Sequence, residues 1–327
     1  MSIKVLNGDC LEVLDQLPEK SVDTCITSPP YYGLRNYERE GQIGLEETSE
    51  EYVDKIVEVF RKVRRVLKDE GTVWLNLGDS YASNHYTGAR DSDTGWKHGE
   101  LSQGHQARAG GARGVFKVKD LMGIPWMVAF ALRADGWYLR QDIIWHKPNP
   151  MPESVKDRCT KAHEYIFLLS KNKKYYYDND AIREPHTWEE SKPRPSGMER
   201  NAQKYRSKVN YGGGGSGFAG HSGSLKADGT SLNHPDGRNK RSVWTVTTKP
   251  FKDAHFATFP PDLIKPCILA GCPEDGTVLD PFGGSGTTGV VANRYGRNAI
   301  LIELNDEYAE MSRNRIYNDS PLFVDVE

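Results

Sequence analysis

The chain has 327 residues, of which 37% are hydrophobic, and a formal net charge of −2 at pH 7. This length allows one large domain with insertions or two domains, and no apolar run approaches the ~20 residues that a membrane span needs. No N-terminal segment resembles a signal peptide and the five cysteines form no Cys-x-x-Cys pair, so we expect a cytoplasmic protein with reduced cysteines and no membrane contact.

Segments typical of strands and helices alternate along the chain. A strand is expected at residues 4–7, a short helix at 11–17 and a second strand at 22–26. A longer helix begins near Thr48, whose hydroxyl forms a capping box with Glu51, and continues to Gly71. Further on, the pattern predicts a strand at 72–77, a helix at 121–134, and strands at 138–145 and 165–169. This alternation favours a mostly parallel sheet covered on both faces.

The strand at 22–26 leads into the motif Thr27-Ser28-Pro29-Pro30-Tyr31-Tyr32. Two consecutive prolines cannot donate backbone hydrogen bonds, but their carbonyl groups can still accept them. Ser28 Oγ and the Pro29 carbonyl are therefore suited to accept the two hydrogens of an exocyclic amine, and Tyr31 offers a flat face for stacking. The alternative interpretation is a rigid Pro-Pro turn at the start of a loop.

Two segments, 82–118 and 186–241, are polar, rich in glycine and without hydrophobic periodicity. Loops of this length in a compact domain indicate a function. The first of them contains His85, His98 and His105, which have no metal-ligand spacing, so we expect no metal site.

A glycine-rich turn, Asp280-Pro281-Phe282-Gly283-Gly284-Ser285-Gly286-Thr287-Thr288, follows an apolar strand at 277–279 and precedes a helix at 289–295. Glycines let the backbone approach a ligand closely, and the first amides of the helix point toward it. Glu303 ends the next strand about twenty residues later, where a carboxylate can accept both hydroxyls of a ribose. This arrangement predicts a nucleoside-binding corner.

The turn also indicates what its ligand is not. Gly-Lys-Ser/Thr is missing after the glycines, which disfavours a triphosphate, and the spacing departs from GxGxxG. At the strand tip, Asp280 would repel a pyrophosphate and attract a cation. A ligand with ammonium and sulfonium centres fits better than NAD.

Both motifs resemble those of the amino-group DNA methyltransferases that use S-adenosylmethionine. Their order is similar to that of the circularly permuted beta group, in which the catalytic motif comes first and the cofactor motif last. Residues 7–10 resemble the segment that contacts the adenine of the cofactor, and 254–261 the segment beside its methionine end. The resemblance implies an α/β Rossmann-like methyltransferase fold, with a mostly parallel seven-stranded sheet, helices on both faces and a loop-rich target-recognition insert.

This resemblance divides the chain into a catalytic half at 1–182 that includes the loop insert 82–118, a target-recognition insert at 183–252 and a cofactor-binding half at 253–327. The net charge of −2 at first argues against a nucleic-acid partner. However, residues 183–252 contain thirteen Lys and Arg against six Asp and Glu, which favours a surface facing DNA. The alternative for this segment is a solvated, disordered loop.

The resemblance also implies a role for each candidate site residue. The catalytic residues are Ser28, Pro29, Pro30 and Tyr31. The cofactor-binding residues are Asp9, Cys10, Thr27, Phe259, Asp280, Phe282, Gly283, Gly284, Ser285, Gly286, Thr287 and Glu303. The substrate-binding residues are Tyr32, Trp145, Lys147, Asn149, Arg194, Arg206 and Arg241, with Arg200 and Arg238 as further candidates in the insert. For Trp145, Lys147 and Asn149 the alternative is a proline-stiffened connection between strands.

The implied reaction is methyl transfer to the exocyclic amine of a base rotated out of double-stranded DNA. Serine before Pro-Pro-Tyr favours cytosine N4, because Ser28 can both donate and accept, and the alternative is adenine N6. Two other hypotheses are a DNA-binding scaffold with a degenerate cofactor site and an enzyme acting on an RNA base or a protein amide. A cognate restriction endonuclease and a homodimer are possible partners.

Overall fold

A computed structural model of the chain describes residues 1–34, 41–82, 116–185, 234, 236–248, 259–321 and 324–326. The chain divides into two compact units. The main unit comprises Met1–Ala181 and Arg241–Glu327, and the second comprises Ile182–Lys240.

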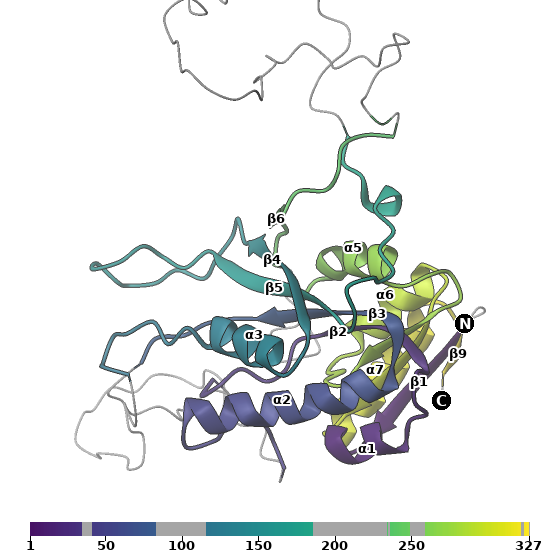
Figure 1. Ribbon diagram of the computed structural model, residues 1–327, viewed down its shortest axis with the longest axis horizontal. Coiled ribbons are helices and arrows are strands. Elements are labelled where there is room, and N and C mark those ends of the chain that lie inside the picture. Colours follow the sequence, from purple (N-terminus) through teal and green to yellow (C-terminus); the bar gives the residue numbers. More distant parts are fainter. Residues whose placement is uncertain are drawn as a thin grey trace, which may run out of the picture. The chain divides into compact units, whose positions relative to one another are not determined.

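The main unit is built on one mixed sheet (Figure 1). In chain order the elements are β1 (Ser2–Asn7), α1 (Cys10–Gln16), β2 (Val22–Thr27), α2 (Ser49–Val66), β3 (Leu67–Leu77), α3 (Ile124–Ala134), β4 (Tyr138–His146), β5 (His163–Ser170), the 3-10 helix η1 (Asp180–Ile182), β6 (Val243–Thr245), α5 (Pro261–Gly271), β7 (Thr277–Asp280), α6 (Thr287–Arg294), β8 (Asn298–Glu303), α7 (Asp306–Asp319) and β9 (Asp325–Val326).

The strand order is β6-β4-β5-β3-β2-β7-β8-β1-β9, and only the pairs that include β5 are antiparallel among the described strands. The predicted α/β class and mostly parallel sheet are therefore confirmed. Nine strands rather than the predicted seven are present in the described part of the chain. The additional edge strands β6 and β9 have three and two residues, too short for periodicity to reveal them.

Helices cover both faces of this sheet, as predicted (Figure 1). On one face α2 packs against both α1 and α3, and on the other α6 packs against both α5 and α7. The apolar side of α2 carries the fully buried Ile56, Phe60 and Val63, which join one core with Val73 and Leu75 of β3. Burial of these side chains fixes the helix on the sheet.

The long helix starts where the sequence predicts and ends earlier. Thr48 Oγ1 accepts the Glu51 amide while the Glu51 side chain accepts the Thr48 amide, so the predicted capping box is present. However, α2 ends at Val66 and not at Gly71, because Leu67 already pairs with Val22 of β2. The early pairing extends β3 to eleven residues.

The neighbouring position of β2 and β7 places the two sequence motifs together. Thr24 and Cys25 of β2 pair in parallel register with Val278 and Leu279 of β7, at the centre of the sheet. Both strands therefore end at the same edge, with β1, β3 and β8 beside them. Ligands of open α/β sheets bind at this carboxyl edge, where the strand order changes direction.

In the second unit, the described residues show a small internal contact. Glu184 and Arg238 form an antiparallel backbone bridge, and Arg183 donates to the Gly237 carbonyl at 3.1 Å. Residues 241–248, which the sequence prediction assigns to the insert, belong to the main unit, where β6 pairs with β4. Of the helices in the described ranges, none is long and apolar enough to cross a membrane.

Candidate active site

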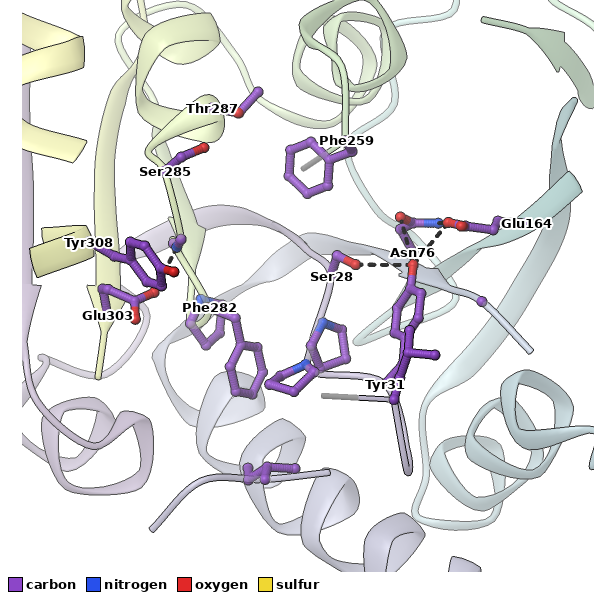
Figure 2. Close-up of a pocket in the computed structure, with 18 of the residues that line it drawn as sticks. Ser28, Tyr31, Asn76, Glu164, Phe259, Phe282, Ser285, Thr287, Glu303 and Tyr308 are labelled. Carbon is purple, nitrogen blue, oxygen red and sulfur yellow. Dashed lines mark hydrogen bonds between the residues drawn. The ribbon is translucent and has the colours of Figure 1, made fainter. Parts of the chain in front are cut away.

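A cavity of about 880 Å³ lies at the carboxyl edge of the sheet. Its lining includes residues directly after five strands, namely Gly8 after β1, Ser28 after β2, Gly78 after β3, Pro281 after β7 and Leu304 after β8. Residues from opposite ends of the sequence therefore share one cavity. Figure 2 shows Glu303 and Tyr308 at one side, Glu164 and Asn76 at the other, and Ser28 between them.

The glycine-rich turn adopts a conformation that only glycine tolerates easily. Gly284 and Gly286 have φ values of +50° and +79°, in the left-handed region. A Cβ atom at Gly286 would lie 2.3 Å from Ser312 Oγ, so the turn packs directly on α7. This close packing brings Gly283, Gly284, Ser285 and Thr287 to the cavity surface, as their predicted role requires.

Glu303 lies at the tip of β8 and lines the cavity. Its Oε2 accepts the Gly284 amide at 2.8 Å and its Oε1 accepts the Asn305 amide at 2.9 Å. Burial raises the pKa of Glu303, while these two amide bonds act in the opposite direction. Each carboxylate oxygen retains a second lone pair, so the group is able to accept ribose hydroxyls while it holds the turn.

Asp280 lies behind the cavity wall and not on the cavity surface, where its position at the strand tip led us to expect it. It is 1% exposed and does not line the cavity. Its Oδ1 accepts from Thr27 Oγ1 at 2.6 Å and from the Phe282 amide at 3.1 Å, and its Oδ2 accepts from Thr288 Oγ1 at 2.6 Å. Asp280 and Thr27 therefore hold the two motifs together behind the cavity wall, which corrects the expectation that this carboxylate meets a cation directly.

Ser28 is connected to a group of polar side chains deeper in the cavity. Ser28 Oγ donates to Tyr31 OH at 3.3 Å, and Tyr31 OH lies 2.9 Å from Glu164 Oε2 and 3.3 Å from Asn76 Oδ1 (Figure 2). Asn76 Nδ2 donates to the same Glu164 oxygen at 3.2 Å. The Ser28 hydroxyl is thus linked to side chains of β3 and β5 through Tyr31 of its own motif.

The Tyr31 ring is fixed by its packing. A Cβ atom at Gly78 would lie 2.6 Å from Tyr31 Cε2, so only glycine leaves room for the ring there. Burial raises the pKa of Tyr31 well above its ordinary value, with the Glu164 charge contributing in the same direction. The phenol is therefore neutral, and its hydroxyl is directed toward Ser28 and Glu164.

The Pro-Pro turn is anchored from α2. Tyr52, which is fully buried, donates its hydroxyl to the Pro30 carbonyl at 2.9 Å. Ser28, Pro29, Pro30 and Tyr31 all line the cavity, whereas Thr27 does not. A buried donor of this kind fixes the direction of the turn, because a Pro-Pro segment has no amide of its own to do so.

The segment after β4 brings three predicted substrate residues to the cavity. The Lys147 ammonium lies 4.2 Å from the centroid of the Trp145 ring and forms an ion pair with Glu164. Asn149 exchanges two hydrogen bonds with the backbone of Thr248, each of 3.1 Å. These contacts connect the segment to β5 and to the chain after β6.

Some predicted site residues lie elsewhere. Tyr32 is 6% exposed, its ring packs 5.5 Å from that of Tyr52, and its hydroxyl donates to the Glu47 carbonyl, so it belongs to the core and not to the cavity lining. Gly286 caps α6 behind the surface and Arg241 lies before β6, outside the lining. Residues outside the described ranges include Arg194, Arg200, Arg206 and the three histidines His85, His98 and His105.

Other predicted cofactor residues do line the cavity, and several lining residues were not predicted. Asp9, Cys10, Phe259 and Phe282 belong to the first group. Asn76, Asp79, Lys161, His163, Glu164 and Tyr308 belong to the second. Asn76 lies near the carboxyl end of the predicted strand 72–77, which is the edge where the cavity lies. Glu164 precedes the predicted strand 165–169 and reaches the same edge only because β5 runs antiparallel to β3 and β4, which the sequence does not predict. Among the described residues no cluster of acidic, His or Cys side chains could hold a metal.

A glycine turn with a carboxylate at the next strand tip, opposite a Ser-Pro-Pro-Tyr motif, defines the class of Rossmann-like methyltransferases with a permuted motif order. The model of the DNA methylase family of N6 and N4 enzymes matches residues 22–314. The chain therefore belongs to this DNA methylase family, and it is an S-adenosylmethionine-dependent amino-methyltransferase of the N4/N6 type, as the resemblance predicts.

Similar proteins agree with this membership over nearly the whole chain. Type II methyltransferase M.SmaI from Serratia marcescens is 44% identical over 315 residues, which cover 96% of this chain and 91% of that protein. Type II methyltransferase M.Cfr9I from Citrobacter freundii is 44% identical over 319 residues, which cover 96% of this chain and 88% of that protein. These identities show that the relationship extends through both motif regions.

Solved structures share the fold. The cytosine-N4-specific PvuII DNA methyltransferase superposes with a TM-score of 0.61 at 19% identity, covering 97% of this chain and 92% of that one. TTHA0409 from Thermus thermophilus, solved with S-adenosyl-L-methionine, superposes with a TM-score of 0.57 at 22% identity and covers 99% of both chains. The predicted Rossmann-like methyltransferase fold is thus confirmed.

Proposed function

We propose that the protein transfers a methyl group from S-adenosylmethionine to N4 of a cytosine rotated out of double-stranded DNA. The observation that carries this proposal is the shared cavity, in which the nucleoside corner at Glu303 and the amine-accepting motif at Ser28 face one space. A donor and an acceptor held in one water-poor site react far faster than separate molecules, because their alignment is fixed in advance.

The residues around Glu303 fit the cofactor. The Glu303 carboxylate is suited to the ribose hydroxyls, and Asp9 and Cys10 line the same cavity. Phe282 adds apolar surface between Glu303 and Ser28, and Phe259 adds apolar surface above Ser28 in the view of Figure 2. When bound, the cofactor supplies a methyl group already activated by its sulfonium centre. The chain itself must chiefly align the acceptor and exclude water.

The residues around Ser28 fit an exocyclic amine. Ser28 Oγ and the Pro29 carbonyl would each accept one amine hydrogen, which turns the nitrogen lone pair out of conjugation with the base. Trp145, Lys147 and Asn149 would border the base itself. A base that leaves the duplex loses stacking and pairing worth a few kcal/mol, and contacts of this kind compensate for that loss.

Cytosine is preferred over adenine for two reasons. Serine precedes Pro-Pro-Tyr in this chain, at Ser28, and the resemblance associates serine at this place with cytosine N4. In addition, a structure that shares the fold with a TM-score of 0.61 is that of a cytosine-N4-specific enzyme. The alternative acceptor is adenine N6.

We further propose that recognition of the DNA sequence depends on the insert 183–252, with Arg194, Arg206 and Arg241 among its contacts. The basic excess of this segment supports contact with phosphates and base edges. The 44% identical relatives are Type II methyltransferases, which supports a role in modification beside a cognate endonuclease. A homodimer and a cytoplasmic location belong to the same proposal.

Analysis of nucleosides tests the proposal. Duplex DNA is incubated with the protein and methyl-labelled S-adenosylmethionine, digested to nucleosides and examined by mass spectrometry. We expect labelled N4-methyldeoxycytidine and no label in RNA or protein supplied in parallel. Labelled N6-methyldeoxyadenosine would show that the target base is adenine and not cytosine. Absence of label from DNA would overturn the proposal.

A further inference from the structure

We propose that Glu164 is a positioning residue that sets the direction of the Ser28 hydroxyl through Tyr31. This inference rests on the proposed role of Ser28 as acceptor of the amine hydrogen. Glu164 belongs to β5, which the motif analysis does not connect with catalysis, yet its carboxylate closes the series of hydrogen bonds that begins at Ser28 (Figure 2).

The Glu164 carboxylate is enclosed by donors. Its side chain is 16% exposed. Oε2 accepts from Tyr31 OH at 2.9 Å and from Asn76 Nδ2 at 3.2 Å, and Oε1 accepts from the Lys147 ammonium. A carboxylate that lies among three donors keeps a fixed orientation, and the Lys147 charge balances its own.

The acceptor-only nature of Glu164 decides how Tyr31 is arranged. The neutral phenol has one proton, and an ionised carboxylate at 2.9 Å attracts it more strongly than the Asn76 carbonyl at 3.3 Å. With its proton directed to Glu164, the Tyr31 oxygen presents lone pairs to its other neighbour. Ser28 therefore donates its hydroxyl proton to Tyr31, at 3.3 Å.

Ser28 has only one proton, so this donation leaves the lone pairs of Oγ for the substrate amine. Without Glu164, the same hydroxyl could turn its proton toward the amine and compete for the nitrogen lone pair. In the transfer, that lone pair forms the bond to the methyl carbon, and the carbon–sulfur bond breaks with its electrons on sulfur. The nitrogen becomes positive, strengthening its hydrogen bond to Oγ, and afterwards releases one proton to solvent.

A double-mutant cycle tests whether Glu164 acts through Tyr31. The four proteins are the wild type, Tyr31→Phe, Glu164→Gln and the double variant, compared by kcat, by KM for DNA and by cofactor affinity. We expect each single change to lower kcat by about tenfold while KM and cofactor affinity stay within about twofold. Because both changes break the same connection, the double variant should be no slower than the slower single variant. Multiplicative losses in kcat would overturn the inference.

Two further variants separate this inference from the role of Ser28. If Ser28→Ala transfers methyl groups at the wild-type rate, the proposed function of Ser28 fails whatever the cycle shows. If Ser28→Ala is impaired and Glu164→Gln has wild-type kcat, only the positioning role fails. Glu58→Gln, an exposed carboxylate of α2 paired with Lys55, controls for the loss of a charge. If Glu164→Gln does not fold, Glu164→Asp gives the same cycle with Tyr31→Phe.

Discussion

The side chains of Thr27 and Asp280 share a hydrogen bond of 2.6 Å although 253 residues separate them. Both are buried, with exposed fractions of 1%, and their neighbours Ser28 and Pro281 line the cavity. The bond therefore acts as a connection between β2 and β7 just where each strand ends. It places the Ser-Pro-Pro-Tyr motif beside the glycine turn without occupying the cavity.

The substitution Asp280→Asn should change how the free energy of unfolding depends on pH. Burial raises the pKa of Asp280 above the ordinary 3.8, although bonds from Thr27 and Thr288 act in the opposite direction. A carboxyl with a higher pKa in the folded state favours folding below its unfolded value, and this contribution is lost as pH rises through the folded pKa. Asparagine has no such titration. The free energy of unfolding of the variant minus that of the wild type should therefore increase as pH rises above 3.8.

Urea unfolding of both proteins at several pH values from about 4 to 7 measures this difference. Protein-wide acid effects cancel in the comparison, because every other carboxyl group is the same in the two proteins. A difference that stays constant over the range would show that the Asp280 carboxyl is not shifted upward in the folded state.

Gly78→Ala should impair catalysis while cofactor binding remains. The added methyl group would lie 2.6 Å from the Tyr31 ring, so the ring and its hydroxyl must move away from Ser28 and Glu164. Small displacements of aligned groups cost large factors in rate, and we expect kcat to fall by about tenfold or more. Stopped-flow single-turnover kinetics and calorimetric cofactor titration check this. Equal losses in both measurements would place the effect in the fold and not at Tyr31.

The sequence predicts the framework of this site better than its polar interior. Hydrophobic periodicity and the Thr48 capping box predict the start of α2, and the glycine turn with Glu303 predicts the nucleoside corner, because these signals are local. Glu164 escapes prediction since its importance depends on Asn76 of β3 and on Tyr31 of the turn after β2, which are distant from it in sequence. For α7, polar side chains on most of the helix weaken the periodic signal, and only Ala309, Ser312 and Ile316 are buried.

Glu303→Gln should weaken cofactor binding more than it weakens folding. The carboxylate accepts two amides, from Gly284 and Asn305, on its two oxygens. The glutamine side chain has only one oxygen, so one of these two backbone amides would face the side-chain NH2 group, which is itself a donor. That backbone amide would then lose its hydrogen bond. We expect the Kd for S-adenosylmethionine to rise by about tenfold or more. Calorimetric titration measures it, with Glu307→Gln on the first turn of α7 as the control; equal affinities for both variants would contradict the ribose role of Glu303.

Arg315→Met should reveal how α7 supports the glycine turn. Arg315 Nη1 lies 2.9 Å from the Ser285 carbonyl, Ser285 Oγ and Thr287 Oγ1, and burial lowers its pKa. Because the guanidinium only donates, the two hydroxyl groups accept from it and keep their own protons for the cavity side. Removal of these donors should raise the Kd for S-adenosylmethionine by about tenfold.

The matched control for Arg315 is Arg313→Met. Arg313 lies on the same helix and donates to the Val5 carbonyl of β1 at 2.8 Å, away from the turn. Its loss should lower the melting temperature and leave cofactor affinity unchanged, whereas Arg315→Met should change both. If the two variants lose stability equally and both bind the cofactor as tightly as the wild type, Arg315 serves packing alone, and the hydroxyl groups of Ser285 and Thr287 need no help from α7 to face the cavity.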